Sequence, residues 1–321
     1  MNKRKKQIRD LWKLVFGDSN SFIRLFFGRV YQDANALSIE KDGEVVCALQ
    51  MLPYTMQFYG EEISVAYIAG VCTHPAERGK GLAKQLMEQA VDEMKKRGIA
   101  LSALIPAEKW LSDYYRPFGY TETFEYSLKV YTRHEWFHPE PTCKVVRQVN
   151  EPSGEIFAYF DRKLRERPLG ILHSQEDFQV IFKDLTMSDG VLSLALNKEN
   201  HPVGMAFVAK TPPTASTESS VLIKEFLYDD ESIKKQLLYA ITKDFGVEKA
   251  VYRYPVINNS VPYPYGMARV IDTERLIALW TATHPDSSIS PDAMRALDIP
   301  TLTARLLDYP HRTAYMSLML D

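Results

Sequence analysis

Hydrophobic residues recur at helical spacing near the start of the chain. Residues three and four positions apart share one face of an α-helix, so this spacing predicts an amphipathic helix over residues 5–16. The apolar residues on its face are Ile8, Leu11, Trp12, Leu14 and Val15. A second helix is predicted over residues 21–31, with a buried side made of Phe22, Leu25, Phe26 and Val30.

Strand signals follow and lead into the strongest helix signal of the chain. Turn residues at Asp42-Gly43 and at Gly60 predict two hairpins. A helix is predicted over residues 82–97, with Gly98 as its stop. The other predicted elements are strands at 36–39, 45–52, 55–58, 63–71 and 99–105, a helix at 107–116 and a strand at 121–130. A strand, a loop, a helix and another strand in this order predict a βαβ crossover, and hence an α+β fold with a mixed sheet.

A second cycle of elements follows residue 150. The predicted elements are helices at 154–166, 175–186 and 231–245, strands at 190–197, 202–210, 220–227 and 248–254, and a polar loop at 211–219. Residues 221–246 repeat the strand, loop and helix order of residues 65–97. In place of the glycines, however, the second loop has the sequence YDDE at 228–231. We therefore expect a degenerate structural repeat.

Two proline-rich stretches, at residues 133–144 and 262–266, suggest domain boundaries. They divide the chain into segments 1–135, 136–265 and 266–321. The last segment is predicted to hold short helices at 273–283, 291–297 and 300–308, and a strand at 313–320. It is small for an independent core, so we expect it to pack on the rest.

Composition narrows the function classes. The chain has 321 residues and a formal net charge of −2, so it has no global basic field and we expect no nucleic-acid partner. Cys47, Cys72 and Cys143 are too widely spaced for a disulfide framework or a metal site, which fits a reducing cytoplasm. The basic start is followed by a short apolar run that contains Lys13, unlike a secretory signal. No apolar window has the length of a membrane span. We therefore expect a cytoplasmic protein without a metal and without a membrane partner.

The loop at residues 78–81 is the main candidate for chemistry. Gly79 and Gly81 allow a tight turn close to a ligand, and the helix that starts there offers free amides and a positive dipole end, which suit a pyrophosphate. Arg78 and Lys80 add positive charge. Taken alone, the loop could equally be an ordinary strand-to-helix turn. It is neither a Walker loop nor a dinucleotide fingerprint, because the required residues are missing and Lys84 occupies the third glycine position.

The stretch from Val71 to Ala83, VCTHPAERGKGLA, resembles the CoA-binding motif of the GNAT acyltransferases. The family's loop usually begins with Gln or Arg, where this chain has Ala76. The stretch from Tyr115 to Tyr120, YRPFGY, resembles the family's second landmark, an aromatic residue followed by Gly and another aromatic. These two landmarks cover about the first 130 residues.

The wider layout resembles the enhanced-intracellular-survival (Eis) branch of that family. The resemblance implies a catalytic GNAT domain at 1–135, a degenerate GNAT-like domain at 136–265 and a short sterol-carrier-like segment at 266–321. The stretch from Gly266 to Asp272 looks like the entry to that last segment, which is much shorter here than is usual. Relatives of this branch form rings of subunits, so the resemblance leaves a homo-oligomer open, although nothing in this chain shows one.

The resemblance also implies the chemistry: an amine attacks the thioester of acetyl-CoA directly. The cofactor would be held by main-chain groups of Val71, Cys72 and Thr73 and by the loop residues Arg78, Gly79, Lys80, Gly81, Leu82 and Ala83. Tyr115 would be the general acid, and the C-terminal carboxylate of Asp321 would be the base.

Several alternatives stay open for these roles. Tyr115 could be a packing residue, with Tyr114 the nearest competitor for the acid, and Asp321 could simply end the chain. Other candidate bases are Glu108, Asp113 and His74, although His74 precedes a proline, where a turn role is expected. Cys72 invites a covalent acyl-enzyme interpretation, but small buried cysteines are common.

The acceptor site is expected at the first helices, the turn near residues 52–58 and the third segment. Its candidate residues are Phe22, Phe26, Tyr54 and Trp110, although Phe22 and Phe26 at helical spacing also suit a core. The predicted function is acetyl transfer to a small-molecule primary amine. The competing hypotheses are a non-catalytic acyl-CoA sensor or scaffold, and a protein-directed lysine acetyltransferase.

Overall fold

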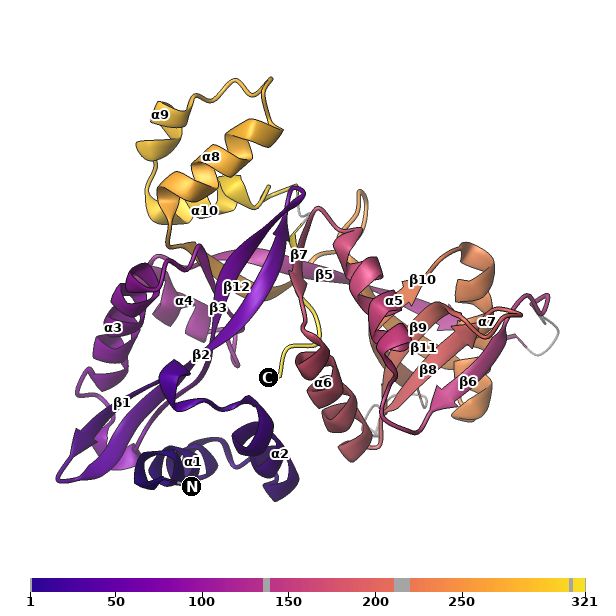
Figure 1. Cartoon of the computed structure of the whole chain (residues 1–321), viewed down its shortest axis with the longest axis horizontal. Helices are drawn as coiled ribbons and strands as arrows, with labels where there is room; N and C mark the ends of the chain where they lie inside the picture. Colours follow the sequence, from indigo (N-terminus) through magenta and orange to yellow (C-terminus); the bar gives the residue numbers. More distant parts are fainter. Residues whose placement is uncertain (1, 135–138, 211–219, 312–313, 321) are drawn as a thin grey trace. The chain divides into compact units, whose positions relative to one another are not determined.

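The computed structural model describes residues 2–134, 139–210, 220–311 and 314–320, and Figure 1 labels most of its α-helices and strands. Contacts group these residues into two units. The first contains the described residues between 2 and 124 and between 264 and 314, and the second those between 125 and 263 and from 315 to 320. These bounds differ from the three predicted segments, and the three-segment division stays a prediction. The predicted loop at 211–219 and Asp321 lie outside the described residues.

The first unit is built on a mixed sheet. Its elements are α1 (Lys3–Phe16), α2 (Asn20–Leu25), η1 (Phe26–Val30), η2 (Asp33–Asn35), β1 (Ala36–Lys41), β2 (Glu44–Phe58), β3 (Glu61–Thr73), η3 (Pro75–Glu77), α3 (Leu82–Lys96), β4 (Leu101–Leu104), α4 (Leu111–Tyr115), η4 (Arg116–Phe118), β12 (Tyr263–Val270), α8 (Thr273–Thr283), α9 (Pro291–Arg295) and α10 (Ile299–Leu306). Strand β5 (Thr121–Thr132) leaves this unit after Phe124, and β13 (Ala314–Tyr315) after Ala314. β2 pairs antiparallel with β1 and β3, while β4 pairs parallel with β3 and antiparallel with β12. The predicted mixed α and β fold is confirmed.

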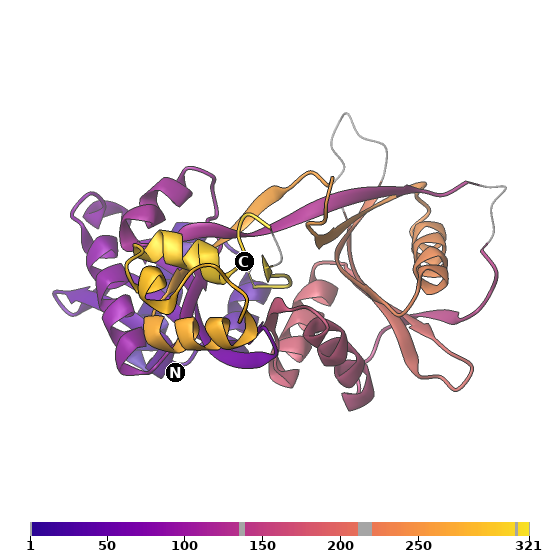
Figure 2. The same ribbon diagram turned by 90° about the horizontal axis from the view of Figure 1, so that it is seen from above.

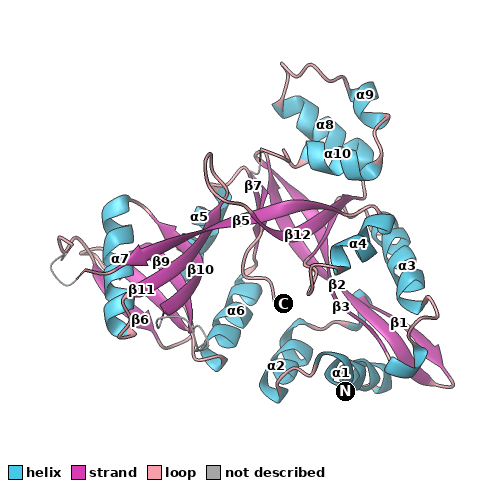
Figure 3. Cartoon of the chain, turned by 180° about the vertical axis from the view of Figure 1, so that it is seen from behind, coloured by secondary structure: helices cyan, strands magenta, loops and turns pink. Residues whose placement is uncertain are grey.

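Helices cover both faces of this sheet (Figure 3). The apolar stripe of α3 is buried with β2, β3 and β4, and its members are Leu86, Met87, Ala90, Val91 and Met94. Helix α1 packs on the hairpin of β2 and β3 through Ile8, Leu11 and Trp12. It begins at the side-chain cap Asn2 and ends at Gly17, which takes the left-handed conformation that glycine adopts without strain. The sequence period therefore predicts which helix faces are buried.

The second predicted helix is interrupted in the structure. α2 stops at Leu25, and residues Phe26–Val30 form a π-helical turn in which the amide of Tyr31 donates to the carbonyl of Phe26. The wider turn places the adjacent side chains of Phe26 and Phe27 both in the core, at 1% and 4% exposure. An uninterrupted α-helix would point neighbouring side chains about 100° apart, so the strict helical period misses this feature.

Strand β12 lies where the sequence suggests a boundary. Proline and glycine at residues 262–266 look like a linker, yet Met267 pairs with Leu104 and Val270 with Leu101. Met267 and Ala268 are completely buried. The segment thus completes the sheet of the first unit, which no local pattern indicates.

The second unit also has a sheet with helices on both faces. Its elements are β6 (Lys144–Gln148), α5 (Gly154–Arg165), β7 (Leu169–Leu172), α6 (Gln175–Met187), β8 (Val191–Leu196), β9 (Pro202–Lys210), β10 (Ser220–Tyr228), α7 (Glu231–Asp244) and β11 (Lys249–Pro255). Its strands pair in the order β6, β8, β9, β10, β11 and the second half of β5. Leu194 packs with α5 and α6 while the next residue, Ala195, packs with α7. Helix α7, orange in Figure 2, therefore covers the face opposite to α5 and α6.

Both units contain a parallel strand pair joined by a helix, namely β3, α3, β4 and β10, α7, β11. The two helix starts differ. In the second unit the side chain of Asp230 accepts hydrogen bonds from the amides of Ser232 and Ile233, so a carboxylate caps the helix. In the first unit no side chain caps α3. The second unit as a degenerate GNAT-like domain stays a prediction.

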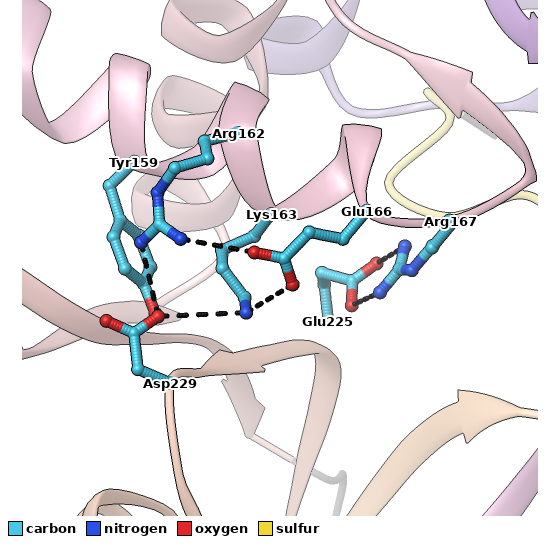
Figure 4. Close-up of polar contacts among 7 residues, drawn as sticks. All are labelled: Tyr159, Arg162, Lys163, Glu166, Arg167, Glu225 and Asp229. Atoms are coloured by element: carbon cyan, nitrogen blue, oxygen red, sulfur yellow. Dashed lines mark hydrogen bonds and ion pairs between the residues drawn. The ribbon is translucent and has the colours of Figure 1, made fainter. Parts of the chain in front are cut away.

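A buried ion pair in the second unit holds the chain's last described residues. Arg167 makes two hydrogen bonds to the carboxylate of Glu225, at 2.7 and 3.1 Å (Figure 4). Burial alone would raise the pKa of Glu225, but the charge and hydrogen bonds of Arg167 outweigh it and hold that pKa below its ordinary value. The hydroxyl of Ser317 also donates to Glu225, and the carbonyl of Ser317 accepts from Nε2 of His173 at 3.0 Å.

Candidate active site

Strand β3 extends beyond its parallel pairing with β4. Their parallel pairing runs from Val65 opposite Leu101 to Tyr67 opposite Ala103. β3 then continues to Thr73 while β4 ends at Leu104. The carboxyl end of a parallel strand that leads to a helix N-terminus is a usual place for a ligand in a sheet of this kind.

A bulge at Gly70 lies in the part of β3 beyond its pairing with β4. The register of β2 and β3 shifts between Ala48 and Gln50, and Gly70 has a φ of +60°. The ring of Trp12 lies against it, so closely that a Cβ at this position would be 2.0 Å from a ring carbon. The indole N–H of Trp12 donates to Asp18 at 2.7 Å, which holds the ring in place. Only glycine fits here, because both the backbone angle and the available space exclude a side chain.

The glycine-rich loop is open. Gly79 and Gly81 both have φ of +78°, and a Cβ at either position would meet nothing within 4 Å. Gly81 is the N-cap of α3 and has no side chain to satisfy the first amides of the helix. The described residues that line the loop, from Arg78 to Gly81, are exposed. The helix N-terminus is therefore accessible to an anion.

The charges around this loop are partly paired. The carboxylate of Glu77 lies 2.9 Å from Nζ of Lys80 and 3.1 Å from Nζ of Lys41. The hydrogen bond from Lys80, followed by that from Lys41, lowers the pKa of Glu77. Nε of Arg78 donates to the carbonyl of Thr73 at 3.4 Å, which ties the loop to the end of β3. An incoming anion would thus compete with Glu77 for Lys80.

The predicted cofactor residues outside the loop lie at the end of β3 and the start of α3. Val71, Leu82 and Ala83 are half-buried and pack on the core under α3. The hydroxyl of Thr73 lies 3.1 Å from Sγ of Cys47. Cys72 is 2% exposed, and burial raises the pKa of its thiol to about 12. A thiol that stays protonated at neutral pH is a poor nucleophile, so the structure disfavours a covalent role for Cys72.

Tyr115 ends helix α4 in an aromatic cluster. Its ring lies 5.2 Å from Tyr114 and 6.2 Å from Tyr120, and it is 8% exposed. Burial raises the pKa of the Tyr115 phenol. Within the described chain its hydroxyl has no hydrogen-bond partner, whereas that of Tyr120 lies 2.7 Å from Ser102, which donates to the carbonyl of Ala66. Tyr115 thus keeps its phenol protonated at neutral pH and packs in the same core cluster as Ile68 of β3 and Leu104 of β4.

The turn after Tyr115 is fixed from β12. Gly119 has a φ of +82° and ends η4. The guanidinium of Arg269 donates to the carbonyl of Phe118 and would lie 3.0 Å from a Cβ at Gly119. Sequence reasoning missed Arg269, because it lies about 150 residues away in a stretch that resembles a linker.

The structure also places the alternative acid, Tyr114, and most of the candidate bases. The hydroxyl of Tyr114 is buried and unpaired within the described chain, and burial raises its pKa. Among the bases, Nδ1 of His74 accepts from the amide of Ala76 at 3.3 Å, which is the expected turn role. Asp113 pairs with Arg116, and Glu108 is exposed. Asp321 cannot be placed because it lies outside the described residues.

The predicted acceptor residues occupy different settings. Phe26 packs with Phe22 at 6.1 Å and with Trp12 at 4.6 Å, so these three rings form one cluster. Tyr54 is buried and meets Tyr67 edge-on at 6.0 Å. Trp110 is 67% exposed at the start of α4. Sequence reasoning missed Trp12 and Gly70 as a contact; a glycine within a strand pattern is the signal that could have suggested a bulge.

A groove of about 560 Å³ lies beside the loop. It is lined by α1, the turn between β1 and β2, and residues 74–77. Its carboxylates are those of Asp10, Asp42, Glu44 and Glu77, against the lysines Lys6 and Lys41. The lining carries more negative than positive charge, which suits cations rather than anions.

A comparison with known families matches the N-terminal part of the first unit. Residues 2–123 match the family model described as an acetyltransferase (GNAT) domain. These residues form a GNAT acetyltransferase domain. The matched GNAT domain contains the loop at 78–81, the bulge at Gly70 and Tyr115. No curated protein matches the chain by sequence.

Solved structures share the fold over most of the chain. A GCN5-related N-acetyltransferase from Anabaena variabilis has a TM-score of 0.72 at 16% identity, covering 86% of this chain and 73% of that one. Eis1 from Mycobacterium abscessus has a TM-score of 0.65 at 12% identity, covering 87% and 75%. N-myristoyltransferase from Saccharomyces cerevisiae with bound myristoyl-CoA has a TM-score of 0.52 at 10% identity, covering 83% and 79%. The likeness to the Eis branch is thus confirmed for the fold.

Two further observations concern membranes and metals. None of the helices in the described ranges combines the length and the apolar character that crossing a membrane requires. In the same ranges, no group of three or more His, Cys, Asp or Glu side chains is placed to hold a metal ion.

Proposed function

We propose that the chain transfers the acetyl group of acetyl-CoA to a primary amine. The observation that carries this proposal is the open, uncapped start of α3, which follows the part of β3 that extends beyond its pairing with β4. An anion at a helix N-terminus gains about 0.3–2 kcal/mol from the helix dipole, in addition to hydrogen bonds from the free amides. The family match of residues 2–123 supports this use of the loop.

The donor would lie along β3. The diphosphate of CoA would accept from the amides at Gly79 to Ala83, with Arg78 and Lys80 near it. The pantetheine arm would pair with main-chain groups of Val71, Cys72 and Thr73, which have no β4 partners in the described ladder. The bound myristoyl-CoA of the yeast enzyme supports an acyl-CoA in this fold.

The reaction needs a polarised carbonyl, a stabilised leaving group and a base. The amide at Val71, turned by the bulge at Gly70, would donate to the thioester oxygen as an oxyanion donor does. The amine nitrogen attacks the carbonyl carbon, the carbon–sulfur bond breaks, and the sulfur receives a proton from Tyr115. Because burial makes the phenol a weaker acid, its hydrogen bond to the developing thiolate is the larger contribution.

The proton that the amine loses needs an acceptor. We assign it to the C-terminal carboxylate of Asp321, as the Eis-like layout suggests. An α-carboxylate has an ordinary pKa of about 3.5 and is a weak base in water, so burial or a relaying water would have to assist it.

The decisive experiment compares Tyr115→Phe with wild type in a thiol-release assay with acetyl-CoA and a panel of amines. General acid catalysis contributes about 10²–10⁴-fold, so kcat should fall by that order. The dissociation constant of CoA, measured by calorimetry, should not change. Tyr114→Phe is the matched control, because it removes a neighbouring hydroxyl and should leave kcat near the wild-type value.

Two results would redirect the proposal. If wild type binds CoA but releases no thiol with any amine, the chain is a sensor or scaffold rather than an enzyme. If Tyr114→Phe rather than Tyr115→Phe abolishes turnover, the acid is Tyr114. Conversion of the C-terminal α-carboxylate to an amide tests the base separately, because deletion of Asp321 would leave the α-carboxylate of Leu320 in its place; unchanged turnover of the amide would refute that assignment.

A further inference from the structure

The amide of Gln50 is buried without a partner. Gln50 is 0% exposed, and within the described chain neither its Oε1 nor its Nε2 has a hydrogen-bond partner. A buried amide without hydrogen bonds is costly, so such groups are rare and call for an explanation. Gln236, which is buried to a similar degree, shows the usual case, because its Oε1 accepts from the amide of Cys143 at 3.1 Å.

Gln50 lies where β3 bulges. It pairs with Ala69, and the register shift that includes Gly70 begins at this pair. Its strand neighbours Leu49 and Met51 pack in the core under α3. Because successive side chains of a strand point to opposite faces, Gln50 points to the other face, the one on which α1 packs.

This face borders the proposed reaction centre. The ring of Trp12 lies against Gly70 here, with Phe26 4.6 Å from that ring and Asp18 bonded to its N–H. Val71, whose amide is proposed to polarise the thioester, follows Gly70 directly. The residue opposite Gln50 is alanine, so no long side chain extends toward the amide from that pair.

We propose that Gln50 binds the acceptor, with Oε1 accepting an N–H of the attacking amine. This inference rests on the proposed function. A neutral amine has N–H groups to donate while its lone pair attacks, so a carbonyl acceptor can orient it without removing a proton. Orientation of this kind brings the reacting atoms into the range of about 3–3.5 Å required for attack. The ligand class is therefore an amine with at least one free N–H.

The proposal predicts that substitution of Gln50 changes stability and activity in opposite directions. Replacing the unpaired amide by a methionine, which has a similar length and volume, removes the cost of burying it. Gln50→Met should therefore raise Tm by about 2–4 °C. This is the shift expected when the free energy of unfolding rises by the cost of burying one unpaired amide in a domain of moderate size. The same variant should lower kcat/KM for the amine tenfold or more, as expected when a substrate hydrogen bond is lost. The CoA dissociation constant should stay unchanged.

Gln236→Met is the matched control. It removes an amide that is already satisfied, in the second unit, and should lower Tm without changing kcat/KM. If Gln50→Met lowers Tm, the amide has a structural partner, such as a buried water, and the proposal is overturned. A raised Tm with unchanged kcat/KM overturns it as well.

Failure of the proposed function is recognised separately. If wild type shows no turnover, the amine panel is tested by thermal shift in the absence of chemistry. Amines that raise the Tm of wild type but not of Gln50→Met support the binding role. No amine-dependent shift in wild type, or an equal shift in both proteins, overturns it.

Discussion

Gly70→Ala is expected to destabilise the first unit strongly. The backbone φ of +60° costs an L-residue about 1–2 kcal/mol. The new methyl group would lie 2.0 Å from a ring carbon of Trp12, against a normal contact of about 3.5–4 Å. Trp12 is 6% exposed and contacts Phe16, Phe26 and Phe27, so it cannot move freely and overpacking adds about 1–3 kcal/mol. The total is about 2–5 kcal/mol.

The assay is urea unfolding followed by tryptophan fluorescence. Trp12, Trp110 and Trp280 lie in the first unit, so the signal reports mainly on it. Gly98→Ala is the matched control, because Gly98 has a φ of +65° but nothing within 4 Å of a Cβ. It should lose only the backbone contribution of about 1–2 kcal/mol.

A double-mutant cycle isolates the contact. In a Trp12→Ala background the methyl group meets no ring, so Gly70→Ala should cost about as much as Gly98→Ala. Sucrose keeps the double variant folded during the measurement. Two results would refute the reasoning. Gly70→Ala could lose the same free energy of unfolding with and without the Trp12 ring, or it could lose no more than Gly98→Ala does.

Two further predictions concern buried groups. Cys72→Ser should keep kcat close to wild type in the thiol-release assay, because a thiol whose pKa burial raises to about 12 forms no thiolate nucleophile; loss of turnover together with an acetylated Cys72 in the wild-type mass spectrum would contradict this. Glu225→Gln should cost about 3–5 kcal/mol of unfolding free energy at pH 7, because it leaves Arg167 buried without its counter-charge. Since the folded-state pKa of Glu225 is lowered, its contribution is complete above the unfolded pKa of about 4.3 and is lost as pH falls through the folded pKa. Urea unfolding from pH 7 to 3 should therefore show the gap between the two proteins closing below about pH 4, and a constant gap would contradict the assignment.

Local patterns predict much of the fold. The spacing of Leu82, Leu86 and Ala90 identifies the buried face of α3, and Asp42-Gly43 identifies the turn between β1 and β2. These features depend on a few neighbouring residues. Strand β12 depends instead on pairing between Met267 and Leu104, and no neighbour of Met267 carries that information.

The candidate site likewise has some features that local sequence predicts and others that depend on contacts between distant segments. The loop at Gly79 and Gly81 is readable because its chemistry is local. The contact of Trp12 with Gly70 joins two segments far apart in the chain, and the isolation of Gln50 is visible only when its surroundings are known. Sequence shows that a glutamine is present, but whether its amide has a partner is a property of the packed core.

Completion of the first unit has a consequence during synthesis. β4 ends at Leu104, but its partner in β12 begins about 160 residues later. At a translation rate of about 5–20 residues per second, the ribosome needs roughly 8–30 s to deliver that partner. Throughout this interval the nascent sheet presents one open edge of β4, a site at which strands of other chains can pair. The newborn protein therefore depends on folding helpers or on quick elongation more than a contiguous domain of the same size would.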